Sequence, residues 1–164
     1  MRSFLANQQP VFYKLLTGQE EILDQDGNAT GQFLPQYGPL RPAMLCVSPN
    51  KGRVEAEEFG TLLDYDRTMT TADTECEIDE NTVLWVDGAD TSGPYNAVVR
   101  QRAVWKNSVQ YAIKRVTVRE YQQEQEQRQA ADRLRARREA NARENSNEAE
   151  SQVSRASLGP GGEV

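Results

Sequence analysis

The sequence predicts a mainly β protein, a small β-barrel or sandwich that carries a long C-terminal α-helical extension. Residues 1–118 consist of short β-rich runs separated by turn signals, without helical periodicity between them. At Arg119 the composition changes to strong helix formers that lack Gly and Pro. These two observations divide the chain into a β domain over 1–118, a polar projecting helix over 119–145 and a low-complexity tail over 146–164.

The β domain contains several candidate strands with distinct turn chemistry between them. Pro35 predicts that the run 32–37 is an edge strand, because proline cannot donate a hydrogen bond to a neighbouring strand. Asn107-Ser108 predicts a tight hairpin turn between the two longest runs. Asp24 to Asn28 resembles the start of a calcium loop but lacks its Gly and Glu positions, which favours a hairpin turn. The expected strands are the runs 11–16, 20–24, 32–37, 41–48, 62–70, 82–86, 95–106 and 109–118.

The helical region is polar on every side. About 25 residues at 1.5 Å each make a rod on the order of 40 Å. It has few apolar residues and no heptad seam, so we expect it to project or to lie against a partner rather than fold onto its own core. Residues 119–164 offer too little apolar surface to offset the entropy of ordering, so assembly is expected to order them.

The composition narrows the classes of function. The chain of 164 residues has no histidine, which removes the histidine-dependent nucleophiles and most zinc sites. An enzyme would have to use carboxylate, Lys or Tyr side chains, and the sequence shows no set of such residues spaced as an active site. We therefore expect no enzyme activity, no metal and no cofactor. Cys46 and Cys76 are expected to be free thiols of a cytosolic protein. No apolar run is long enough for a membrane span, and the net charge of −6 disfavours a general nucleic-acid binder.

The stretch CEIDENTVLWVD, residues 76–87, joins an acidic half to an apolar half. Without a supporting imidazole, the carboxylates from 75 to 80 are interpreted as a solvated turn that leads into a strand. In that role Asp79 or Asn81 would hydrogen-bond the local backbone. Leu84 and Val86 would then point to one face of the strand, and Val83 and Trp85 to the other. Trp85 is either a core residue or an interface anchor.

Charge is distributed unevenly along the chain. Residues 1–90 hold six basic and sixteen acidic residues, a net charge of −10, whereas residues 91–118 hold five basic residues and no acid. Arg100 and Arg102 lie two apart on a strand, which predicts one shared face. With Trp105 and Tyr111 they could form an oligonucleotide platform. The alternative is head-to-tail contact between identical copies, acidic surface against basic hairpin, which closes into a ring.

Three strings carry a resemblance to a known family: NKGRVEAEEFGTLLDYDRTMTT, EIDENTVLWVD and PYNAVVRQRAVWKNSVQYAIKRVTV. Together they resemble small structural proteins of tailed bacteriophages, described as head-tail connector or head-closure (stopper) proteins. The resemblance covers roughly residues 10–118, and residues 119–164 depart from it. Its most telling pieces are Lys51-Gly52, Phe59-Gly60, Asp64-Tyr65-Asp66, Ile78-Asp79-Glu80, Leu84-Trp85-Val86-Asp87, Pro94-Tyr95 and Asn107-Ser108.

The resemblance implies a structural virion protein of the neck, between capsid and tail, made in the host bacterial cytoplasm. Its expected partners are further copies of itself in a closed ring, a portal or adaptor protein, and a tail-tube or tail-terminator protein. Phage DNA would pass through the channel without sequence-specific binding, and no membrane is involved. An adaptor or tail-terminator ring and an OB-like single-stranded nucleic-acid-binding module are the alternatives.

The candidate contact residues of the ring or neck come from three places: the polar loop 50–60, the last hairpin and the helix. They are Lys51, Arg53, Glu57, Glu58, Arg100, Arg102, Lys114, Arg115, Tyr121, Arg133, Leu134 and Arg137.

Overall fold

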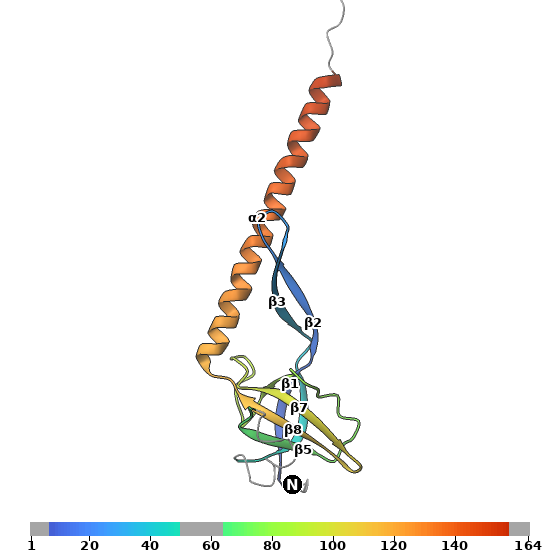
Figure 1. Cartoon of the computed structure of the whole chain (residues 1–164), viewed down its shortest axis with the longest axis vertical. Helices are drawn as coiled ribbons and strands as arrows, with labels where there is room; N and C mark the ends of the chain where they lie inside the picture. The colour runs from blue at the N-terminus through green and yellow to red at the C-terminus, as the bar shows by residue number, and fades with distance from the viewer. Residues whose placement is uncertain (1–6, 50–63, 158–164) are drawn as a thin grey trace, which may run out of the picture. The chain divides into compact units, whose positions relative to one another are not determined.

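Six strands form a closed antiparallel barrel in the order β1-β4-β5-β8-β7-β6, so the barrel alternative is confirmed (Figure 1). The computed structural model describes residues 7–49 and 64–157, with side chains as far as 147. The described residues fall into two compact units: 7–19, 35–49 and 64–124 form one, and 20–34 with 125–157 form the other. The barrel strands are β1 (Gln8–Lys14), β4 (Arg41–Val47), β5 (Arg67–Thr71), β6 (Val83–Trp85), β7 (Ala97–Trp105) and β8 (Ser108–Arg115).

The side chains on the inner face of the alternating strands form the core of the barrel. Leu84 and Val86 belong to the core cluster, whereas Trp85 is buried outside it, opposite Phe12 of β1. The predicted faces of this strand are therefore confirmed. The fully buried core side chains are Val11, Leu45, Met69, Ile78, Leu84, Val86, Ala97, Val99, Val109, Tyr111 and Ile113.

Strands β2 (Leu16–Leu23) and β3 (Ala29–Tyr37) pair with each other in a separate two-stranded sheet. The Asp24 carboxylate accepts hydrogen bonds from the backbone N–H groups of Asp26, at 2.9 Å, and Asn28, at 2.8 Å. Gly27 takes a positive φ of 91°, which suits a residue without Cβ. The calcium-like string is thus a hairpin turn, as predicted, and Pro35 lies in a two-stranded sheet, where each strand has an unpaired side.

A β-bulge in β7 overturns the prediction that Arg100 and Arg102 share a face. The register runs from Val99 opposite Ile113 to Gln101 opposite Ala112, so Arg100 is the extra residue. Arg102 then lies opposite the core residue Tyr111, on the inner side of the barrel. One inserted residue reverses the alternation, and the spacing alone could not reveal it. The β7–β8 turn is Lys106-Asn107, one residue earlier than predicted, because Trp105 pairs with Ser108.

The acidic stretch between β5 and β6 is held by one apolar side chain. Ile78 is 0% exposed in the barrel core, while its acidic neighbours are exposed. Asp79 accepts a hydrogen bond from the backbone N–H of Glu80 at 2.8 Å, which confirms its local role. Asn81 has a positive φ of 63°, typical of a turn residue. The segment is a structural turn closed by Ile78.

The helix α2 (Val118–Ser157) extends twelve residues beyond the predicted end at 145. No Gly or Pro occurs from 118 to 157, and Gly159-Pro160 follows, so nothing in the composition stops the helix earlier. Within the described part of the chain, no helix has the length and apolarity that a membrane span requires.

Candidate functional site

An aromatic cluster fastens the start of α2 to the barrel. Tyr95, in the loop before β7, lies edge-on to Tyr121, with ring centroids 5.3 Å apart, and edge-on to Trp85 at 6.2 Å. Its hydroxyl donates a hydrogen bond to the Glu124 carboxylate. The Tyr37 ring, at the end of β3, lies 6.4 Å away. Because edge-to-face aromatic pairs are attractive, this cluster ties the first turns of the helix to the barrel and to the base of the hairpin. We call Tyr37, Trp85, Tyr95 and Tyr121 the aromatic anchor.

The helix begins with a capping box. The Glu120 carboxylate accepts from the backbone N–H of Thr117 at 2.7 Å, and the Thr117 hydroxyl accepts from the N–H of Glu120 at 3.3 Å. The hydrogen bonds from Thr117 hold the pKa of Glu120 below its usual value. The start of α2 is therefore defined by its own sequence as well as by the aromatic anchor.

Tyr121→Ala should loosen the first turns of α2 without affecting the barrel. Loss of an aromatic pair worth about 0.5–1.5 kcal/mol should raise amide exchange at residues 118–124 roughly 2- to 10-fold. Hydrogen exchange with mass spectrometry measures this, and amides of β8 provide the internal reference.

The matched control is Tyr121→Phe, which keeps the ring and should exchange like the wild type. Equal exchange in the Ala and Phe variants would show that the ring contact does not hold the helix start.

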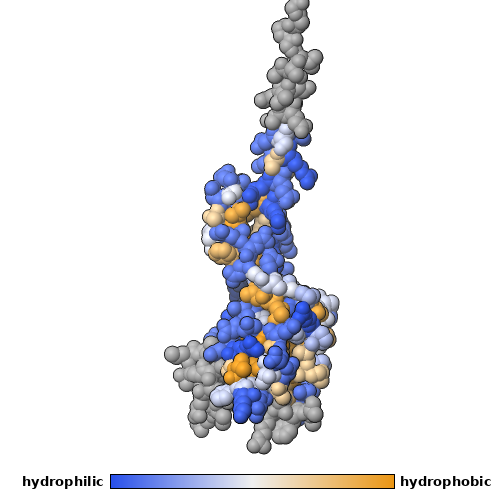
Figure 2. All heavy atoms as spheres, turned by 90° about the vertical axis from the view of Figure 1, so that its right-hand side faces the viewer, coloured by the Kyte–Doolittle hydropathy of each residue, from blue (hydrophilic) through white to orange (hydrophobic). Residues whose placement is uncertain are grey.

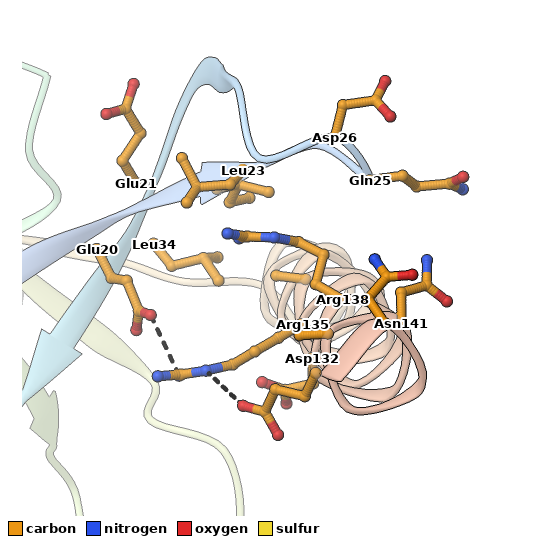
Figure 3. Close-up of a pocket in the computed structure, with 15 residues that line it drawn as sticks. Glu20, Glu21, Leu23, Gln25, Asp26, Leu34, Asp132, Arg135, Arg138 and Asn141 are labelled. Atoms are coloured by element: carbon orange, nitrogen blue, oxygen red, sulfur yellow. Dashed lines mark hydrogen bonds and ion pairs between the residues drawn. The ribbon is translucent and has the colours of Figure 1, made fainter. Parts of the chain in front are cut away.

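The second unit contains a pocket of about 640 Å³ between the β2–β3 hairpin tip and α2 (Figure 3). The Arg135 guanidinium lies between two carboxylates, Glu20 at 3.2 Å and Glu139 at 3.8 Å. Leu34 is buried, and Arg138 packs against the Gly27 turn. Exposed ion pairs of this kind contribute only about 0–1 kcal/mol each. The pocket walls come from Glu20, Glu21, Ile22, Leu23, Gln25, Asp26, Leu34, Ala131, Asp132, Arg135, Arg138, Glu139, Asn141, Ala142 and Asn145.

One ion pair of the barrel is largely buried. The Arg67 guanidinium, with a side chain 7% exposed, bonds the Asp87 carboxylate, and its Nε donates to the Ser48 carbonyl at 2.5 Å. The hydrogen bond from Arg67 holds the pKa of Asp87 below its usual value. The pair joins the start of β5 to the turn that follows β6, so its role is structural.

A cleft opens where β4 leaves β5. The pairing of these strands covers only Cys46 and Val47 of β4, so residues 41–45 face the segment 71–77 across a cleft of about 700 Å³. Arg41 and Glu77 form an ion pair at its edge. Burial, followed by the Glu77 charge, raises the pKa of the Tyr13 hydroxyl. We call this space the β4 cleft; it is lined by Gln8, Tyr13, Arg41, Pro42, Ala43, Met44, Leu45, Thr71, Ala72, Asp73, Glu75, Cys76 and Glu77.

Two of the four predicted contact side chains of the last hairpin, those of Lys114 and Arg102, have partners within the barrel. Lys114 forms an ion pair with Asp64, and the backbone N–H of Arg115 donates to Asp66. The Arg102 guanidinium donates to the Cys76 carbonyl at 3.2 Å, while Arg100 is exposed. The predicted basic face is therefore partly neutralised by acids from the earlier part of the chain.

The other predicted contact residues lie apart from the hairpin. Tyr121 belongs to the aromatic anchor, Leu134 is half-buried, and Arg133 and Arg137 are exposed on α2. Lys51, Arg53, Glu57 and Glu58 lie outside the described residues.

The apolar tip of the β7–β8 hairpin was not predicted from the sequence. Val104 is 61% exposed and Trp105 is 52% exposed, directly before the Lys106-Asn107 turn. On the face shown in Figure 2, hydrophobic residues form small separate patches among hydrophilic ones. A Trp beside a two-residue turn has few neighbours to bury it, and that signal was present in the sequence.

The fold defines a mainly β protein: a six-stranded antiparallel barrel with an additional hairpin and one long C-terminal helix. Among residues 7–49 and 64–157, no group of three or more Cys, Asp or Glu side chains is placed to hold a metal ion. Cys46 and Cys76 are not joined in a disulfide bond. Comparison with family models, curated proteins and solved structures found no match to this chain.

Proposed function

We propose that this chain is a structural protein of the head-tail interface of a tailed bacteriophage, a head-closure ring that joins the portal or adaptor to the tail and extends the DNA channel. The observation that carries the proposal is the resemblance of residues 10–118 to head-closure proteins. The second and third resembling strings fall on consecutive elements of one closed barrel, from the turn before β6 to the end of β8.

The physical properties of the barrel suit a ring subunit. Closure of the barrel pairs every barrel strand on both sides over at least part of its length, which limits strand pairing between copies that pack side by side. Two elements lie outside the barrel sheet, the β2–β3 hairpin and α2, and both carry many exposed polar groups. Such elements can contact a neighbouring layer of the neck.

An adaptor or tail-terminator ring of the same neck is the second candidate. The 40-residue helix α2 favours it, because a long polar helix can reach a neighbouring layer. The nucleic-acid-binding alternative loses its structural basis, because Arg100 and Arg102 do not share a face.

The proposal is tested in virions and with the purified chain. Mass spectrometry of purified virions should detect the chain in multiple copies, and particles made without it should be heads that lose DNA or lack tails. Negative-stain microscopy of the purified chain, alone and with portal, should show rings with a central channel.

Assembly on purified portal distinguishes an adaptor, which should bind portal directly, from a closure ring, which should need an adaptor layer. Complete virions that lack the chain would contradict the proposal.

A further inference from the structure

The tip of the β7–β8 hairpin carries an exposed apolar surface with a basic end. Val104 and Trp105 expose more than half of their surfaces, and Lys106 follows in the turn. Among the described residues Lys106 forms no ion pair. From 100 to 108 the chain has three basic residues and no acidic one. Trp is the residue type most enriched among interface hot spots, and an aromatic side chain buries roughly 150–250 Å². The tip is thus suited to enter an apolar site with an acidic rim.

The β4 cleft has those properties. Pro42, Ala43, Met44 and Leu45 supply an apolar wall, and Met44 is 52% exposed. The opposite wall carries Asp73, Glu75 and Glu77, and from 68 to 99 the chain contains no Lys or Arg. Glu77 is paired with Arg41, whereas Asp73 and Glu75 have no basic partner in the described part of the chain.

The tip and the cleft are different surfaces of the same unit, at the same end of the barrel. Thr71, which lines the cleft, pairs with Val109, and Val109 pairs with Val104 beside the tip. A contact between two different surfaces of identical chains is heterologous, and it forms a ring when the rotation between copies closes. Because the tip and the cleft lie at the same end of the barrel, copies joined by this contact can lie in one layer.

We propose that Trp105 of one copy inserts into the β4 cleft of the next copy, with Lys106 paired to Glu75 or Asp73, and that this contact links the chains head to tail. The inference rests on the proposed ring function and specifies the surfaces that build the ring. The basic group of the head-to-tail contact is then Lys106 at the hairpin tip, next to exposed apolar surface, in place of Arg100 and Arg102 on the strand.

Substitutions on the two surfaces test the contact by sedimentation velocity of the full chain. Trp105→Ser should weaken association about thirtyfold or more, as expected for a hot-spot residue. Lys106→Glu and Glu75→Lys should each weaken it roughly tenfold, and the double variant should recover most of the loss.

Phe33→Ser is the matched control, because Phe33 is an aromatic residue of similar exposure, 54% against 52% for Trp105, on the β2–β3 hairpin. It should associate like the wild type. Unchanged association of Trp105→Ser, or equal loss in the Phe33 control, would overturn the proposal.

Photo-crosslinking locates the partner surface directly. With benzoylphenylalanine in place of Trp105, irradiation should produce covalent dimers, trimers and larger species, cross-linked to residues 41–45 or 71–77 of another copy. Mixed labelled and unlabelled chains identify the products as intermolecular.

Products that stop at dimers, or that map elsewhere, would overturn the head-to-tail contact, and rings that persist in that case would leave the proposed function standing. Conversely, the expected cross-links in a chain that is absent from virions would keep the contact and reject the neck function.

Discussion

Replacing Ile78 with Ala should lower the free energy of unfolding by about 2–5 kcal/mol, the range for truncation of a fully buried aliphatic side chain. Ile78 is 0% exposed and packs in the barrel core, although it lies in a stretch of five carboxylates between β5 and β6. Its loss leaves a cavity and frees the acidic segment at the same time. Since whole domains are stable by only about 5–15 kcal/mol, a large part of the stability depends on this one residue.

Urea unfolding at fixed protein concentration, followed by tryptophan fluorescence, measures the change. Ile78→Val should cost only about 0.5–1.5 kcal/mol, because it removes one methylene. Glu80→Gln, an exposed neighbour, should stay within about 0.5 kcal/mol of the wild type. If Ile78→Ala is as stable as the Glu80 variant, Ile78 does not close the barrel.

Asp87→Asn should lower the free energy of unfolding by about 2–4 kcal/mol, because it leaves the buried Arg67 guanidinium without its counter-charge. Breaking a fully buried pair costs about 3–5 kcal/mol, and the partial exposure of Asp87 reduces that figure. Asp90→Asn is the matched control: Asp90 is an exposed turn residue bonded to Ser92, and its substitution should change stability by less than about 0.5 kcal/mol.

The same pair predicts a pH dependence with a definite sign. Arg67 holds the folded-state pKa of Asp87 below its unfolded value of about 3.9. The stabilisation is therefore present above about pH 4 and is lost as the pH falls through the folded-state pKa. Urea unfolding from pH 7 to pH 3 should show the difference between wild type and Asp87→Asn shrinking at the acid end. A difference that stays constant with pH would mean that the Asp87 charge does not stabilise the fold.

The sequence by itself determined the features that depend on neighbouring residues. The period-2 alternation put Leu84 and Val86 on one face and Val83 and Trp85 on the other, and the β-rich runs between turn signals located all eight strands within about five residues. The change in composition at Arg119 marked the start of α2 to within one residue. Asp24 and Gly27 identified the β2–β3 turn, because their chemistry acts over only a few residues.

Only the tertiary structure decided how the strands meet. β1 pairs with β6 and β5 with β8, partners that are far apart in the chain, and local patterns are the same whichever distant strand lies alongside. The β4 cleft exists because β4 and β5 separate after two residue pairs. The bulge at Arg100 places Arg102 on the inner side, because a single extra residue reverses every later side chain in a period-2 strand. The exposure of Trp105 had a local signal, its position close to the turn, but whether another strand covers the β7–β8 tip depends on the same non-local geometry.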